Sequence, residues 1–245
     1  MRTLAAGTAR VPRANELLTN KILTALPGED FQRLVPHLEP VTLDSGQTLF
    51  AQGEPARHLF FPENCVVSYQ CGMSDGKSVE VGMIGREGVA GLNALFGPAA
   101  GRQEVGVTVG GSALRARADD ARRELERNAA LRRRLEKFSG DYAAHVSQRA
   151  ACNALHSIEK RFAVWLLLLT ERLDSDTVEM TQERIAAHLG VRRAGITVIA
   201  GELQDKGMVA NSRGSLRVVD RATLERVACE CYWALTGMAQ QTSLL

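Results

Sequence analysis

A chain of 245 residues with 45% apolar and 24% charged residues has the composition of a soluble globular protein, and it is long enough for one or two domains with an ample core. Its net charge of +2 excludes a strongly basic protein, so any binding to nucleic acid has to come from a local patch. The longest apolar run, residues 162–169, is far shorter than the ~20 residues that a membrane span needs.

The start of the chain contains no apolar stretch long enough for a signal peptide, so we expect a cytoplasmic protein with reduced cysteines and no membrane partner. The five cysteines include no Cys-x-x-Cys pair. Cys229 and Cys231 are one residue apart, but their neighbours Glu230, Tyr232 and Trp233 include no histidine. We therefore expect buried apolar cysteines, with no metal site and no cofactor.

The first half of the chain has the pattern of a small antiparallel β domain. Residues 1–18 have the composition of a flexible arm, and prolines punctuate one or two short helices between residues 20 and 38. Short β-prone runs then follow, broken every few residues by Gly, Pro, Asn or Asp, with a hairpin signal at residues 74–77 and a short helix expected at 89–96. We expect an antiparallel β-roll, or jelly roll, over residues 19–128.

A long helix is expected at residues 129–156. Its apolar positions follow a 4-3-4-3 spacing typical of a two-helix seam, at Leu131, Leu135, Phe138, Tyr142 and His145. Such a stripe has to be buried, against the β domain, against a second copy of the chain, or against both. We interpret the segment as a dimerisation helix.

Residues 157–245 have the pattern of a winged helix-turn-helix domain. Ser157 is a candidate cap and hinge ahead of an almost wholly apolar helix at 158–173. Two amphipathic helices follow around a sharp turn at Gly190, the first with Thr181 as its N-cap. Two short strands around Arg213-Gly214 then form a wing.

This domain carries the residues that we expect to bind double-stranded DNA. Two arginines stand at the start of the second helix, where recognition helices contact phosphates and base edges, and the wing tip carries another arginine. An ordinary helical hairpin in a protein core would show the same periodicity, but it needs neither these arginines nor two helical glycines. The candidate DNA-binding residues are Thr181, Gln182, Arg192, Arg193, Ala194, Gly195, Thr197, Val198 and Arg213.

A β-roll, a long seam helix and a C-terminal winged helix-turn-helix, in this α+β order, resemble the CRP/FNR superfamily of bacterial transcription regulators. The block ALHSIEKRFAVWLL, and TQERIAAHLGVRRAGITVIAGELQDKG after it, carries the resemblance. It implies a homodimer built on the long helix, a palindromic operator, and RNA polymerase as a partner. An effector bound in the β-roll would shift the populations of different orientations of the DNA-binding domains about the hinge.

The chain departs from the family where cyclic nucleotides bind. The segment that carries a glutamate for the ribose reads GLNALFG here, so Leu92 follows Gly91 at the glutamate position. The phosphate-binding segment reads GRQEVGV, where Arg102 is followed by Gln103-Glu104 in place of a small hydroxyl residue. Gly91, Leu92 and Arg102 remain candidate effector residues, but cyclic AMP is disfavoured and the effector is unknown. Nor does the chain carry the N-terminal cysteine cluster of oxygen-sensing members.

The recognition helix departs as well. Alignment with the family pattern places Arg193 at the first arginine, Ala194 at the glutamate and Val198 at the later arginine. Because Ala194 and Val198 replace polar side chains that would contact bases, one alternative stays open. The chain would then be a ligand- or protein-binding β-roll module with little specific DNA affinity. An enzyme is not expected, because the chain contains no nucleophile elbow, P-loop, HExxH or paired-carboxylate signature and hence no catalytic residues.

Overall fold

The computed structural model describes residues 18–96 and 101–241. The predicted arm at residues 1–18 therefore lies, except for Leu18, outside the described residues. The elements of the β domain are α1 (Lys21–Thr24), α2 (Gly28–Leu34), the 3-10 turn η1 (Val35–His37), β1 (Glu39–Leu43), β2 (Thr48–Phe50), β3 (His58–Pro62), β4 (Val66–Gly72), β5 (Ser78–Ile84), α3 (Asn93–Phe96), β6 (Glu104–Val109) and β7 (Gly111–Arg117). The remaining elements are α4 (Ala118–Arg127), α5 (Ala129–Leu155), α6 (Ile158–Leu173), β8 (Thr177–Glu179), α7 (Gln182–Leu189), α8 (Arg193–Asp205), β9 (Val209–Ser212), β10 (Ser215–Val218), α9 (Arg221–Val227) and α10 (Cys231–Gln241).

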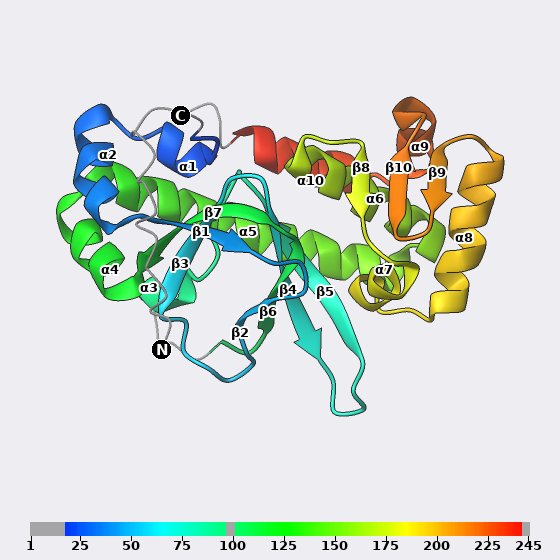
Figure 1. The fold of residues 1–245 in the computed structure, drawn as a ribbon, viewed down its shortest axis with the longest axis horizontal. Helices are drawn as coiled ribbons and strands as arrows, with labels where there is room; N and C mark the ends of the chain where they lie inside the picture. The colour runs from blue at the N-terminus through cyan, green and yellow to red at the C-terminus, as the bar shows by residue number, and fades with distance from the viewer. Residues whose placement is uncertain (1–17, 97–100, 242–245) are drawn as a thin grey trace, which may run out of the picture.

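Two antiparallel sheets form the β-roll, as the sequence predicts. One has the strand order β1-β7-β3 and the other β2-β6-β4-β5, and the apolar residues between them form one core (Figure 1). The predicted hairpin at residues 74–77 joins β4 to β5. The order of elements confirms an α+β fold with a β-roll, a long helix and a C-terminal helix-turn-helix with a small sheet.

The short helix expected at residues 89–96 is wrong in its first half. Helix α3 begins only at Asn93, because Ala90 pairs with Phe60 in an isolated β-bridge. Gly91 then turns the chain with φ +95°, a conformation outside the helical region. A Cβ at this position would come within 2.4 Å of the His58 carbonyl oxygen, so the turn passes close to β3.

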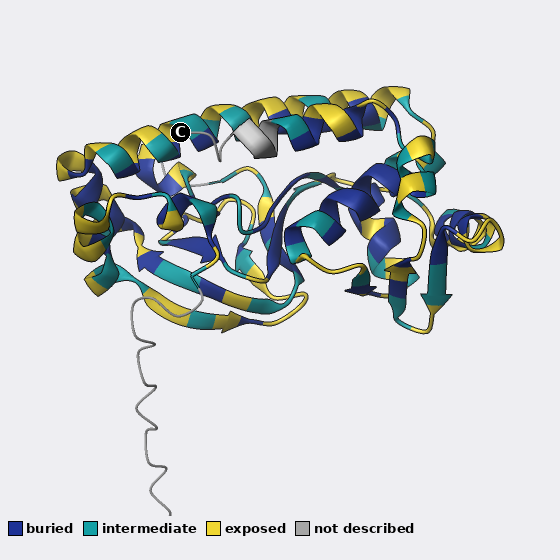
Figure 2. Ribbon diagram, turned by 90° about the horizontal axis from the view of Figure 1, so that it is seen from above, coloured by how far each residue is buried: buried dark blue, intermediate teal, exposed yellow. Residues whose placement is uncertain are grey.

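Helix α5 runs along most of the molecule and touches both domains (Figures 1 and 2). Asn128 caps it by accepting a hydrogen bond from the Leu131 amide at 2.8 Å. The side chains expected to form a dimer seam pack inside their own chain: Leu131, Leu135 and Phe138 belong to the core of the β-roll, His145 is buried, and Tyr142 packs against that core.

The β-roll is shaped to receive this face of α5. A Cβ at Gly88 would come within 2.3 Å of the Phe138 ring, and one at Gly82 within 2.5 Å of the Tyr142 hydroxyl. These glycines allow the aromatic side chains to lie against the backbone of β5 and of the loop that follows it. The β-roll of the same chain therefore covers the predicted stripe from Leu131 to Tyr142, and His145 is buried as well, so these side chains are not exposed to a second copy.

The C-terminal domain is built around α6, in which every side chain from Phe162 to Thr170 is buried. Helices α7 and α8 pack on one side of it, and the small sheet β8-β10-β9 completes the domain. Thr181 caps α7 by accepting from the Arg184 amide, and Gly190 ends that helix with φ +66°. These contacts confirm the predicted cap and turn. Among the described helices, none is long and apolar enough to cross a lipid bilayer.

Candidate nucleic-acid interface and effector cavity

Helix α8 has one buried face and one exposed face. Ile196, Ile199, Ala200 and Leu203 are buried in the core of the domain. The predicted contact residues Arg192, Arg193, Ala194, Thr197 and Val198 are all exposed, on the side that faces away from the core. Val198 is 59% exposed, which is high for a β-branched apolar side chain. The exposed face of α8 therefore begins with two arginines and continues with small or apolar side chains.

Two of the predicted contact residues bond to each other. The Thr197 hydroxyl donates to the side-chain oxygen of Gln182 at 2.7 Å, which fixes the start of α7 against the middle of α8. The Thr181 hydroxyl is occupied as the cap of α7. The Thr197–Gln182 bond therefore joins the two helices, whereas the Thr181 hydroxyl stabilises the start of α7.

The wing places a further arginine near this face. Arg213 is exposed in the turn between β9 and β10, the two strands that the sequence predicts, and Arg217 is exposed on β10. Helix α8 has no acidic residue in its first turn. Exposed arginines on a helix start and on a neighbouring turn form a positive surface that suits a phosphate backbone.

The two glycines of α8 are not required by packing within the chain. A Cβ at Gly195 would meet only the Ile158 side chain, at the ordinary contact distance of 3.8 Å. A Cβ at Gly201 would meet no atom within 4 Å. A glycine in a helix costs roughly 1 kcal/mol relative to alanine, so this cost is not repaid by contacts inside the protein.

A cavity of about 390 Å³ lies between the β-roll and α5. Leu92 and Arg102 line it, as the sequence predicts, whereas Gly91 only borders it and donates its amide to the Tyr69 hydroxyl at 3.0 Å. Most of the wall is apolar. Sequence reasoning missed Tyr69 and Tyr142, whose rings lie 5.4 Å apart across the β-roll and α5.

The polar side chains of this cavity come from both the β-roll and α5. The Tyr142 hydroxyl has no hydrogen-bond partner among the described residues, although it is buried. Burial raises the pKa of Tyr142 well above its ordinary value, so this hydroxyl stays protonated at neutral pH. Gln103 and Glu54 also line the cavity, whereas Glu104 is exposed outside the lining.

A larger cavity, of about 540 Å³, lies between the β-roll and the C-terminal domain. Several of its charged groups are paired within the chain. Arg172 lies 2.8 Å from Glu87, and Arg221 lies 2.9 Å from Glu171. The smaller cavity, by contrast, contains a buried hydroxyl without a hydrogen-bond partner among the described residues, that of Tyr142.

Two family models match the chain. The model for the Crp-like helix-turn-helix domain matches residues 160–227, and the model for the cyclic nucleotide-binding domain matches residues 40–128. The chain belongs to the CRP/FNR family of transcription regulators. It is therefore a DNA-binding regulator and not an enzyme, and the matched segments contain α7 and α8 on one side and the β-roll on the other.

Several solved structures share this fold. The chain is similar to a transcriptional regulator of the Crp/Fnr family from Eubacterium rectale, with 17% identity over 84% of this chain and 96% of that one and a TM-score of 0.65. FixK2 from Bradyrhizobium japonicum is 15% identical over 78% of this chain and 98% of its own, with a TM-score of 0.67. The c-di-GMP responsive regulator CLP of Xanthomonas campestris is 14% identical over 78% of this chain and 99% of its own, with a TM-score of 0.61. No curated protein sequence matches the chain.

Proposed function

We propose that this CRP/FNR regulator binds a palindromic operator as a homodimer, with one α8 helix in each of two successive major grooves. The exposed pair Arg192 and Arg193 at the start of α8 carries the proposal, because a recognition helix contacts base edges with its N-terminal residues. Two such helices related by a two-fold axis read half-sites about 34 Å apart. A regulator of this kind acts in the cytoplasm, with RNA polymerase as a further partner.

The dimer seam lies on the outward face of α5. Its exposed small residues repeat the 4-3-4-3 spacing on the side opposite the β-roll, at Gly140, Ala144, Ser147, Ala151 and Ala154. Small side chains let two helices approach closely, and this row leads toward the hinge at Ser157. Both sides of α5 are then buried in the dimer, one by the β-roll and the other by the partner helix.

The residues at the start of α8 and the wing arginine each have a role in this proposal. Arg193, together with Arg192, supplies guanine or phosphate contacts. Ala194 and Val198 meet thymine methyl groups, and Gly195 lets the helix approach the bases closely. Arg213 on the wing binds a phosphate and contributes affinity without sequence preference.

The effector occupies the cavity between the β-roll and α5 and is not cyclic AMP. Leu92 offers no carboxylate to a ribose, and the only arginine of the lining shares it with Glu54, whose charge opposes a buried phosphate. On the α5 side of the cavity, the unpaired Tyr142 hydroxyl offers a polar group to a ligand, and Ser139 lines the cavity beside it. A ligand that bonds to it joins the β-roll to the helix that carries the dimer seam.

The DNA-binding proposal is tested by selecting operators from a random DNA library and titrating them with the protein. Arg193→Ala should weaken binding to the selected sequence by about 1–3 kcal/mol and relax its sequence preference. Arg33→Ala, an exposed arginine of α2 far from α8, is the control and should bind like the wild type. Absence of any salt-sensitive DNA affinity would support the alternative of a ligand- or protein-binding β-roll module.

The effector proposal is tested separately by thermal unfolding with added nucleotides. Cyclic AMP should not stabilise the protein. Cyclic di-GMP belongs in the panel because one structure with this fold is of a regulator that responds to it. A ligand at 100 times its Kd adds about 2.7 kcal/mol to the free energy of unfolding, so a true effector is easily detected. Stabilisation by cyclic AMP of that size would overturn the proposal.

A further inference from the structure

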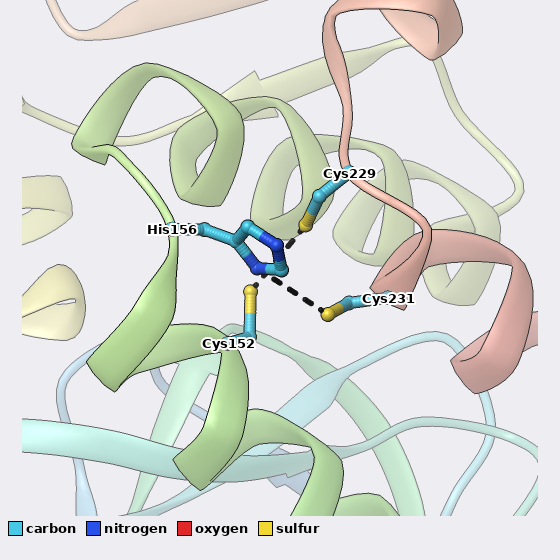
Figure 3. A group of neighbouring side chains, drawn as sticks. All are labelled: Cys152, His156, Cys229 and Cys231. Atoms are coloured by element: carbon cyan, nitrogen blue, oxygen red, sulfur yellow. Dashed lines mark hydrogen bonds between the residues drawn. The ribbon is translucent and has the colours of Figure 1, made fainter.

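Four side chains that can bind metal gather where α5 ends (Figure 3). Cys152 lies in the last turn of α5, and His156 follows one turn later as its C-cap. Cys229 lies in the turn between α9 and α10, and Cys231 is the first residue of α10. Two segments far apart in the sequence thus contribute two possible ligands each.

The distances within this cluster suit a tetrahedral ion. The four ligand atoms all lie within 4.8 Å of one another, with 3.6 Å between the sulfurs of Cys152 and Cys229 and 3.6 Å between the Cys231 sulfur and Nδ1 of His156. Zinc bonds of about 2.3 Å to sulfur and about 2.0–2.1 Å to nitrogen place tetrahedral ligands about 3.5–3.8 Å apart. A disulfide needs a bond of about 2.0 Å, and all these cysteines are free thiols.

The surroundings of the cluster resemble those of a structural metal site. The three cysteines are buried, at 0%, 3% and 1% exposure for Cys152, Cys229 and Cys231. Nε2 of His156 lies 3.3 Å from a Glu230 carboxylate oxygen, so the nitrogen that faces away from the cluster has an acidic partner. Such a carboxylate orients the ring of a metal-binding histidine and raises its basicity. The Gln148 amide donates to the Cys231 sulfur at 3.1 Å.

We propose that Cys152, His156, Cys229 and Cys231 bind one zinc ion in a closed, structural site that fastens the start of α10 to the hinge end of α5. Three thiolates and one imidazole fill all four positions of a tetrahedral ion, which leaves none open for catalysis. Soft sulfur ligands select zinc over magnesium or calcium. The ion lies beside the joint between α5 and α6, so its presence limits how far the DNA-binding domain can turn against α5.

The metal content of the protein tests this site. Untagged protein purified under reducing conditions should contain one zinc ion per chain by elemental mass spectrometry. Cys152→Ser and Cys231→Ser should each lose the ion, whereas Cys71→Ser, a half-buried cysteine of β4 outside the cluster, should retain it. Cobalt added to the metal-free wild type should show the absorption of a tetrahedral thiolate complex, which does not depend on any variant that fails to fold.

A milder variant tests the role of the histidine partner. Glu230→Gln leaves all four ligands in place, and loss of such a partner weakens metal binding about 10–100-fold. Because the Glu230 side chain is 78% exposed, we expect the lower end, about 10-fold, in a competition with a coloured chelator. An unchanged affinity would show that this carboxylate does not support the site.

Two results would overturn the proposal. Reduced, folded wild type that takes up neither zinc nor cobalt has no metal site. A Cys152–Cys229 disulfide in freshly purified protein without metal would assign the pair to redox chemistry instead. Neither measurement involves DNA, so loss of operator binding with zinc retained would count against the proposed function alone.

Discussion

Nδ1 of His188 in α7 lies 3.0 Å from a carboxylate oxygen of Glu80 in β5, and both side chains are buried. The same carboxylate accepts hydrogen bonds from the Ser68 hydroxyl at 2.7 Å and from the Trp165 indole at 3.4 Å. Arg149 of α5 lies 3.7 Å from its other oxygen. One carboxylate of the β-roll therefore contacts α5, α6 and α7, and it joins the β-roll to the helix-turn-helix domain.

Removing the charge of Glu80 should destabilise the protein strongly. Glu80→Gln leaves the Arg149 guanidinium buried without its anion, and breaking a buried pair of this kind costs about 3–5 kcal/mol. Urea unfolding at neutral pH measures the change. Asp75→Asn in the exposed β4–β5 hairpin is the matched control and should unfold like the wild type. A small effect at Glu80 would mean that the buried network contributes little to stability.

The loss of stability in acid should begin with His145. Burial, and then Arg172 and Arg149, hold the pKa of His145 well below its usual value of 6.5. The unfolded chain thus binds a proton that the folded chain does not, so stability falls as the pH drops below about 6.5. His145→Phe should remove up to one proton, or about 1.4 kcal/mol per pH unit, from that slope. The free energy of unfolding should be measured from about pH 7 to about pH 5, where histidines titrate. A variant with the same slope against pH as the wild type would contradict this assignment.

Glu80 adds to the same trend at lower pH. Burial alone would raise the pKa of Glu80, but His188, Arg149 and Ser68 outweigh it and hold the pKa below the usual 4.5. The stability from this carboxylate is present above that value and is lost as the pH falls through the lower pKa of the folded protein.

The local sequence pattern was sufficient to predict the helix-turn-helix. The spacing of Ile196, Ile199 and Leu203 defines the buried face of α8, and Gly190 marks the turn before it. Both signals lie within a few residues of one another. The structure confirms the β-roll, the helix-turn-helix and the wing strands for this reason.

The local sequence pattern could not predict contacts between segments that are far apart in the sequence. The stripe from Leu131 to His145 shows that one face of α5 is buried, but periodicity does not say whether the β-roll or a second copy covers it. Glu80 and His188 are joined only by the packing of two domains. The cysteine cluster was missed because the sequence neighbours of Cys229 and Cys231 contain no histidine. The spacing of Cys152 and His156, one helical turn apart, was the available signal.

Replacing the wing arginine should weaken DNA binding evenly. Arg213→Ala removes one phosphate contact, so the slope of log affinity against log salt should become shallower by about one unit. Sequence preference should not change, because phosphate contacts carry no base information. Titrations at several salt concentrations measure both quantities, with Arg33→Ala as control. A relaxed preference would place Arg213 at a base instead.

Filling the open position in α8 should separate stability from DNA binding. Gly201→Ala adds a methyl group that meets no atom within 4 Å, and it should stabilise the protein by about 0.5–1 kcal/mol. The same methyl group obstructs DNA if the helix lies deep in the groove, so operator affinity should fall while stability rises. Gly237→Ala in α10, also in open space, should show the stability gain alone. Equal DNA affinity for both variants would remove the case for close approach at Gly201.

A charge on the outward face of α5 should separate the dimer. Ala144 is exposed in the middle of the small-residue row, and Ala144→Glu places two carboxylates opposite each other across the two-fold axis. Like charges at an interface cost several kcal/mol, so the dimer Kd should rise by about 100-fold or more. Light scattering after size-exclusion chromatography measures the mass, with Ala187→Glu on the exposed side of α7 as control. The folded β-roll should be unaffected, because its own face of α5 is unchanged. A variant that remains dimeric would move the seam away from this row.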